Sequence, residues 1–333
     1  MKKTAATKAV KTSGKATKNQ LDLRKLFEAF LVDQKCNGNS PKTIRYYNQN
    51  VPRFFDYLEN ENRITDINAE LLYKVKEYTI YLKELKKNDP KTGLPTNKLL
   101  ASSSVRTYVR SVKTFISWMG KEGFIEENIA SKIKLPKQTK KTIEILTEEE
   151  IASIMNWLKK KKSNHFRDLC IFCSSLELGA RLGELTFLKI SDVKVEQGIL
   201  KVLGKGSKER YIPFGVNLQK LFMKYIQYER PTPISDRVES LFLIDDGTPI
   251  STTTIVQLFR RIKEATGIEK LHPHLMRHTM ITYSLTKDTN IFALKQKTGH
   301  SSFEIMGNYL HLAESLCSMK SSKISILDGM SFK

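Results

Sequence analysis

The sequence lacks the marks of a membrane-spanning or secreted protein. No apolar run approaches the roughly 18 residues that a transmembrane helix needs. The basic N-terminus is not followed by the apolar stretch of a secretory signal. The four cysteines have no disulfide-framework spacing, and they are Cys36, Cys170, Cys173 and Cys317. These absences predict a cytoplasmic protein with reduced thiols and no membrane partner.

Motifs for metals and nucleotides are also missing. No G-x-x-x-x-G-K-[ST] loop occurs, which disfavours an ATP-driven enzyme. The three histidines of "HPHLMRH" lack the glutamate of a zinc H-E-x-x-H motif, because Leu275 stands in its place. The single C-x-x-C pair flanks Ile and Phe in an apolar helical run, which favours packing. We therefore expect no metal and no other cofactor.

Acidic residues are scarce relative to basic ones. The chain has 35 Asp and Glu against 56 Lys and Arg, a formal net charge of +21. Residues 1–19 hold six of the lysines and no acid, so the rest of the chain still carries about +15. Such an excess favours a polyanionic partner. Nucleic acid is the leading candidate, and a membrane surface is the weaker one because no long basic amphipathic helix stands apart from the fold.

The pattern along the chain predicts a mainly α protein of two domains. Residues 1–19 are expected to form a basic, disordered tail. Residues 20–138 carry four helical apolar stripes, which predict a helical bundle, with a kink or a break into two helices at Pro52 and a loop at "NDPKTGLPTN". The pattern of residues 139–314 predicts an α+β domain in which a hairpin at 198–214 contributes a small antiparallel sheet. Residues 315–333 form a C-terminal tail.

Basic side chains gather on the bundle opposite the apolar stripes. They are Lys42 and Arg45 at the start of the second helix, and Arg106, Arg110 and Lys113 on one side of the fourth. Most such faces are only solvated. With this net charge, contact with DNA phosphates is an equally good interpretation, and the sequence leaves both open.

The second domain holds scattered groups that a metal-free phosphodiester reaction would need. Arg181 is expected on the flank of a helix spanning 166–188 with Glu184 one turn later, and Lys205 is expected at a hairpin tip. His274 and Arg277 share a helix face, and His300 follows a glycine. Arginines can bind a phosphate in a bidentate manner, lysine can protonate a leaving oxygen, and a phenol can act as nucleophile. Tyr309, taken alone, is either a packed aromatic or that nucleophile.

These motifs, in this order, resemble the tyrosine recombinase (phage integrase, Xer-like) family. The resemblance lies in "LELGARLGELTFLKISDV", "LKVLGKGSKERYIPF", "HPHLMRHTMIT" and "TGHSS", with a tyrosine nine residues after the last histidine. The segment "SPKTIRYYNQNVPRFFDYL" is similar to the family's core-binding domain. The resemblance extends over roughly residues 20–312.

The resemblance implies a catalytic set with assigned roles: Arg181, Lys205, His274, Arg277, His300 and Tyr309. The two arginines would clamp the phosphate, and Lys205 would protonate the leaving oxygen. Tyr309 would form a 3′-phosphotyrosyl bond. His274 would act as general base or phosphate donor, His300 would complete the phosphate site, and Glu184 would orient the site.

The resemblance also implies an assembly and a class of reaction. The enzyme would act as a homo-tetramer on double-stranded DNA, would pass through a Holliday junction and would associate with the nucleoid in the cytoplasm. Integration or excision, resolution and inversion are all open, as is any need for accessory DNA-bending proteins. A type IB topoisomerase and a non-catalytic DNA-binding regulator are the alternatives. The C-terminal tail is expected to dock on a neighbouring protomer.

Two departures from the family pattern bear on the site. Thr298 replaces the leucine usual before Gly-His. Gly307 lies two residues before Tyr309 and is expected to loosen that helix until DNA binds.

Overall fold

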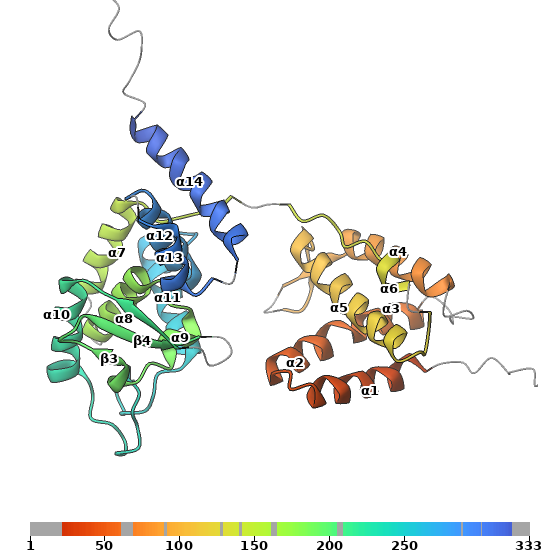
Figure 1. Cartoon of the computed structure of the whole chain (residues 1–333), viewed down its shortest axis with the longest axis horizontal. Coiled ribbons are helices and arrows are strands. Elements are labelled where there is room, and N and C mark those ends of the chain that lie inside the picture. The colour runs from red at the N-terminus through yellow and green to blue at the C-terminus, as the bar shows by residue number, and fades with distance from the viewer. Residues whose placement is uncertain are drawn as a thin grey trace, which may run out of the picture. The chain divides into compact units, whose positions relative to one another are not determined.

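The computed structural model describes residues 22–60, 69–89, 92–126, 129–139, 142–160, 165–204, 209–287, 289–300 and 302–321. The chain divides into two compact units, Met1–Lys141 and Thr142–Lys333, each described separately below (Figure 1). The structure is mostly helical with small antiparallel sheets, which confirms the predicted fold class. The predicted tail at 1–19 and the last part of the predicted C-terminal tail, 322–333, lie outside the described residues. No helix in the described ranges is long and apolar enough to cross a membrane.

The first unit is a helical bundle with one hairpin. Its elements are α1 (Leu23–Cys36), α2 (Pro41–Asn50), α3 (Pro52–Asn60), α4 (Ala69–Glu84), β1 (Lys86–Asn88), β2 (Pro95–Leu99), α5 (Ser102–Lys121) and α6 (Ile129–Lys132). The core is dominated by aromatic rings, with Phe27, Phe30 and Phe115 in mutual edge or stacked contact. Together α1, α3, α4 and α5 bury the stripes that the sequence predicts.

Local sequence signals explain how the helices of this unit begin and end. The Ser40 side chain accepts a hydrogen bond from the Thr43 amide, and Pro41 occupies the first turn of α2, where its missing N–H costs nothing. The break predicted at Pro52 is confirmed, since α2 ends at Asn50 and Pro52 opens α3.

The prediction of a loop at "NDPKTGLPTN" was wrong in part. Strands β1 and β2 pair antiparallel across this segment, with Lys86 opposite Leu99. Gly93, at φ +71°, supplies the left-handed residue that such a tight connection needs. Nearly every residue of the hairpin is exposed, so no apolar alternation marks these strands in the sequence.

The second unit combines helices with a three-stranded sheet. Its helices are α7 (Glu148–Lys160), α8 (His165–Leu178), α9 (Leu182–Thr186), α10 (Val216–Lys224), α11 (Thr252–Thr266), α12 (Pro273–Leu285), α13 (Ile291–Thr298) and α14 (Phe303–Ser321). A 3₁₀ turn (Ile190–Asp192) and a π-helical turn (Tyr225–Glu229) connect some of these elements. The antiparallel sheet has the order β3 (Val193–Lys194), β4 (Ile199–Leu203), β5 (Glu209–Pro213).

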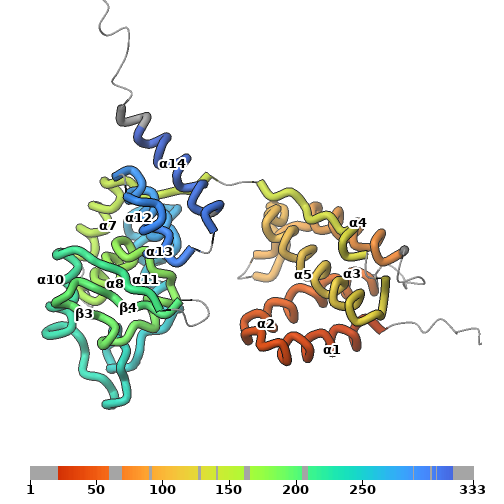
Figure 2. The backbone as a smooth tube through the Cα atoms, in the orientation of Figure 1, coloured from red at the N-terminus to blue at the C-terminus, as the bar shows by residue number. Residues whose placement is uncertain are grey.

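Helix α8 is the centre of this unit. It contacts α7, α9, α10 and α12, and the course of the backbone can be followed in Figure 2. A second, smaller cluster joins α12, α13 and α14 through Met280, Leu294, Met306 and Tyr309. Helix α14 runs through the domain boundary expected at residue 314 and ends at Ser321.

The continuous helix expected over 166–188 is broken. Helix α8 ends at Leu178, Gly179 adopts a left-handed φ of +58°, and α9 begins at Leu182. Arg181 is therefore the residue that precedes α9 and does not lie on a helix flank. The apolar stripe of the sequence continues across the break because residues on both sides of it enter the same core. Periodicity alone could not reveal the break.

Replacement of Gly179 by alanine tests this backbone conformation. An added Cβ would meet the Met280 side chain and would sit on a left-handed residue. Gly267, at φ +71° with nothing near its Cβ, is the matched control for backbone strain alone. We expect Gly267→Ala to lower the free energy of unfolding by about 1 kcal/mol and Gly179→Ala by roughly 2–3 kcal/mol. Urea denaturation measures both, and equal losses would show that the Met280 contact relaxes freely.

Candidate active site

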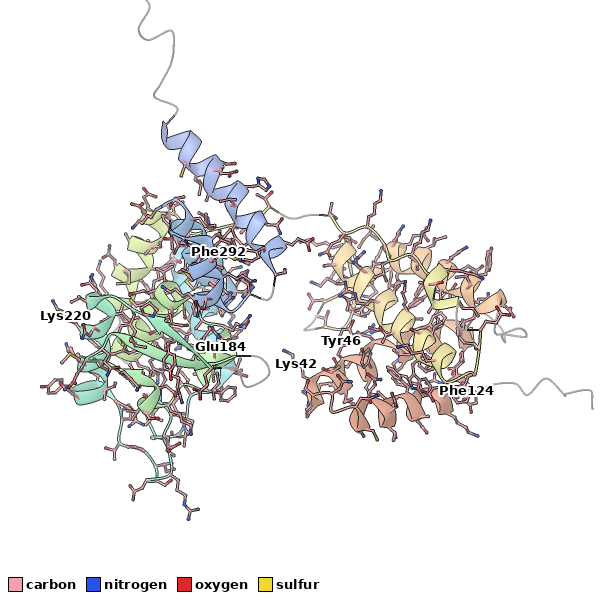
Figure 3. The ribbon with its side chains drawn as sticks, in the orientation of Figure 1. Lys42, Tyr46, Phe124, Glu184, Lys220 and Phe292 are labelled. Atoms are coloured by element: carbon pink, nitrogen blue, oxygen red, sulfur yellow. The ribbon has the colours of Figure 1, made fainter. Side chains whose placement is uncertain are left out.

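Glu184 joins two arginines at the start of α9. Its Oε1 accepts from Arg181 Nη1 at 2.8 Å and its Oε2 accepts from the Arg181 backbone N–H at 2.8 Å. Arg210 of β5 donates Nη1 to Oε1 at 3.0 Å and Nη2 to Oε2 at 2.7 Å. Burial raises the pKa of Glu184, but hydrogen bonds from Arg210 and Arg181 outweigh it and leave the pKa lowered. Glu184, whose position is labelled in Figure 3, is thus a carboxylate that fixes the Arg181 guanidinium.

Arg210 is absent from the catalytic set predicted from the sequence. Its side chain is only 10% exposed, and its Nε also donates to the Lys297 carbonyl at 3.0 Å. A signal was present in the strand alternation, because Arg210 shares the inward-facing side of β5 with buried Ile212. A charged residue at an inward strand position indicates a buried partner.

Arg277 is buried in α12, with 1% of its surface exposed. Its Nη1 donates to the Gly179 carbonyl at 2.7 Å and its Nη2 to the Thr298 carbonyl at 2.6 Å. Both acceptors lie at helix C-termini, where carbonyl groups lack intrahelical partners and carry partial negative charge. Burial and Arg181 lower the pKa of Arg277 to about 10, which still leaves it protonated at neutral pH.

Thr298 fixes the tautomer of His300. The Thr298 hydroxyl donates to the Leu294 carbonyl at 2.7 Å, so toward His300 Nδ1, 2.9 Å away, it acts as acceptor. Nδ1 therefore carries the proton, and bare Nε2 accepts from Arg277 Nη2 at 3.1 Å. Burial and the two arginines lower the pKa of His300 to about 4, consistent with a neutral ring. The threonine that departs from the family pattern thus orients this histidine.

Tyr309 of α14 is both a packed ring and a hydrogen-bonded phenol. It is 3% exposed among Met280, Leu294 and Met306, and burial raises its pKa. Its Oη lies 2.6 Å from Nδ1 of His278. His278 is also absent from the predicted set, although its place directly after Arg277 in "HPHLMRH" was a usable signal.

The structure brings together most of the predicted catalytic residues. Tyr309 contacts His278, the His300 and Tyr309 ring centroids are 6.1 Å apart, and Arg277 links to His300. Arg181 Nη2 donates to the carbonyl of Gly299, directly before His300, at 2.8 Å. His274 is exposed, and its ring contacts His278 edge-on, with centroids 4.6 Å apart. Lys205 lies outside the described residues, in the connection between β4 and β5.

The candidate DNA-contacting residues of the first unit differ in their surroundings. Lys42, labelled in Figure 3, and Arg45 on α2, and Arg110 on α5, are exposed. Arg106 Nη1 donates to the Pro136 carbonyl at 2.6 Å, and Lys113 Nζ donates to the Ile133 carbonyl at 2.7 Å. These two cations hold the segment after α6 against α5 in addition to any contact with DNA, so this face is not a purely solvated one.

The group of side chains in the second unit is suited to an anion that carries two or more oxygens. Among the described residues, Arg181 and Arg210 are hydrogen-bonded to the carboxylate of Glu184. Arg277 lies near enough to all three for their charges to affect its pKa. The neighbouring imidazoles are neutral, so the site keeps an excess of positive charge. A phosphodiester beside Tyr309 would meet forked donors and a phenol capable of attack.

Loss of the Arg210 side chain tests the role of this ion pair. Arg210→Gln leaves buried Glu184 with Arg181 as its remaining cation, so we expect the free energy of unfolding to fall by roughly 2–3 kcal/mol. Arg260 forms an exposed pair with Glu264, and Arg260→Gln should change stability by less than about 0.5 kcal/mol. Chemical denaturation of both variants provides the comparison, and equal values would contradict the buried-pair interpretation.

Comparisons with known proteins agree with the geometry. The model described as "Phage integrase family" matches residues 144–315. The tyrosine recombinase XerC of Lactobacillus leichmannii is 29% identical over 223 residues, 66% of this chain and 76% of the relative. A tyrosine recombinase of Thermosipho africanus is 26% identical over 279 residues, 83% of this chain and 90% of the relative.

Two solved structures share the fold. The integrase of the transposon Tn1549 in complex with transposon right end DNA has a TM-score of 0.69 at 19% identity, covering 89% of this chain and 99% of that chain. XerH in a post-cleavage complex with a palindromic difH substrate has a TM-score of 0.66 at 18% identity, covering 90% and 84%. Because the family match extends over more than half of the sequence, the chain belongs to the phage integrase family, the tyrosine recombinases of site-specific DNA recombination.

Proposed function

We propose that this recombinase cleaves and rejoins DNA through a 3′-phosphotyrosyl bond to Tyr309. The observation that carries the proposal is the convergence of a hydrogen-bonded phenol with two arginines and a neutral histidine from four separate segments. A packed aromatic alone would not need Arg181 and Arg277 within one connected set of contacts. Cations so placed offset the charge that builds on the non-bridging oxygens during attack.

Each residue of the set has a physical role in this reaction. Arg181, fixed by Glu184, and Arg277, fixed by two carbonyls, would bind the non-bridging oxygens. His274, exposed at the edge of the set, would donate to the phosphate. The resemblance assigns the leaving-group proton to Lys205. The covalent intermediate keeps the energy of the broken bond, so rejoining needs no ATP.

The resting conformation covers the two groups that matter most. Arg277 and Tyr309 are 1% and 3% exposed, so a DNA phosphate cannot touch either as they stand. Helix α14 packs on α12 and α13 through the Tyr309 cluster. We therefore include in the proposal a shift of α14 that opens the site when DNA binds.

The proposal also covers how the first unit binds DNA and in which biological process the recombinase acts. The first unit would hold duplex DNA as the core-binding domain, with exposed Lys42, Arg45 and Arg110 on phosphates. Four protomers would exchange strands through a Holliday junction. The biological process would be the recombination of a mobile element. The fold shared with a transposon integrase supports this.

Trapping the covalent intermediate tests the nucleophile. The protein and its Tyr309→Phe variant are incubated with nicked suicide duplexes of candidate sites in EDTA, and adducts are resolved on denaturing gels. We expect a slow-migrating adduct that the variant loses completely, because phenylalanine has no nucleophilic oxygen.

The same assay separates the alternatives. An adduct that survives in Tyr309→Phe assigns the nucleophile elsewhere. Tight site-specific binding without any adduct favours a non-catalytic regulator. Relaxation of supercoiled plasmid without recombinant product favours a type IB topoisomerase.

Stiffening of α14 tests the opening step. Gly307 has nothing within 4 Å of an added Cβ, so Gly307→Ala fits and stabilises the helix by roughly 0.5–1 kcal/mol. If that energy opposes the shift of α14, single-turnover cleavage slows about two- to fivefold. Ser315→Ala, on the exposed side of α14 beyond Tyr309, should leave the rate unchanged. A faster Gly307→Ala variant would argue against a flexible α14.

A further inference from the structure

Tyr309 is hydrogen-bonded to His278, a histidine to which the resemblance to the family assigns no catalytic role. Its Oη lies 2.6 Å from His278 Nδ1, and the two ring centroids are 5.5 Å apart with planes tilted by 36°. The bond joins α12 to α14, two helices that pack directly together. His274, which by the resemblance would act as general base or phosphate donor, has no hydrogen bond to Tyr309 among the described contacts and is exposed instead.

His278 is arranged to accept a proton at this atom. Burial, followed by His274, His272 and Arg277, lowers the pKa of His278 to about 4. His300, at the end of α13, also faces the pair, and its own pKa is lowered to about 4. At neutral pH the His278 ring therefore has a lone pair, and the Tyr309 phenol, whose pKa burial raises, is the donor in their bond.

We propose that His278 is the proton acceptor for Tyr309 during strand cleavage, an inference that rests on the proposed function and requires the Tyr309–His278 contact to be kept when α14 shifts. The Tyr309 Oη–P bond forms as the bond from phosphorus to the 5′-oxygen breaks. The phenolic proton passes to Nδ1 of His278, and the 5′-oxygen takes a proton from a separate acid, for which the resemblance implies Lys205. Rejoining runs the same transfers backwards, with His278 returning its proton to Tyr309.

Binding of the substrate would itself make His278 more basic. The positive charge of Arg277 is among the causes that suppress protonation of this ring. A bound phosphodiester brings negative charge beside Arg277 and offsets that effect. His278 would thus remain a weak base in the resting enzyme and become an effective one on DNA. His274 is then free to donate to the phosphate.

The test compares variants of the full-length protein on the suicide duplex that gives an adduct. His278→Asn places an amide near the position of Nδ1, so it can keep the hydrogen bond but cannot take a proton at neutral pH. His311→Ala, exposed on α14 two residues after Tyr309, is the control. We expect single-turnover cleavage to fall about 100-fold or more in His278→Asn and to stay at the parental level in His311→Ala.

A second substitution separates proton transfer from positioning. Site-specific Tyr309→3-fluorotyrosine lowers the phenol pKa, and it should restore much of the rate in His278→Asn while changing the parental rate little. A duplex with sulfur in place of the 5′-leaving oxygen needs no acid. It should therefore rescue Lys205→Ala but not His278→Asn.

The outcomes distinguish this inference from the proposed function. If the parental protein forms a Tyr309-dependent adduct and His278→Asn cleaves at an equal or higher rate, His278 only restrains the resting phenol and the inference fails. A slow His278→Asn variant that fluorination does not rescue assigns a positioning role and overturns it as well. Absence of any Tyr309-dependent adduct in the parental protein refutes the proposed function instead. Thermal melting and gel-shift binding confirm that each variant is folded and binds the duplex.

Discussion

The site depends on how the buried guanidinium of Arg277 is stabilised by main-chain carbonyls and not by a directly bonded carboxylate. Isolated charges are costly to bury, and Arg277 meets that cost through main-chain carbonyls at the C-terminal ends of α8 and α13. Dipoles stabilise the charge without cancelling it. The break after Leu178 and the end of α13 at Thr298 are therefore parts of the active site as much as parts of the fold. A carboxylate in their place would stabilise Arg277 equally but would repel a phosphate.

Among the described residues of the site, the carboxylate of Glu184 has a different role. Glu184 is hydrogen-bonded to Arg181 and Arg210 together, so it is outnumbered by cations, and the local balance stays positive. Its lowered pKa keeps it ionised as an anchor. Arg210 and Glu184 link the sheet to α9, and Arg210 also reaches the Lys297 carbonyl at the end of α13. Arg181, the proposed phosphate ligand, is thus positioned from the sheet and from two helices.

The elements that could be predicted from the sequence are those with local signals. Apolar stripes and Pro52 predicted the bundle and its break, because burial and the missing N–H act within a few residues. Sequence reasoning missed features that depend on tertiary context. Gly179 breaks a helix inside an unbroken stripe, and the exposed hairpin has no alternation. Arg210 and His278 become visible as site residues only when strands and helices distant in sequence meet. The sequence shows which residue types form the site, but their hydrogen-bond partners are known only from the structure.

The ring of Tyr309, the proposed nucleophile, is also part of the smaller core cluster. Tyr309 fills a position among Met280, Leu294 and Met306, and a shift of α14 would leave that position empty. Vacating such a place costs free energy in proportion to the apolar surface returned to water. In this cluster, packing that stabilises the resting conformation therefore opposes the shift of α14 that the proposed reaction needs. Tighter packing around the ring would make a more durable but slower enzyme, and looser packing would make a faster one that cleaves with less discrimination.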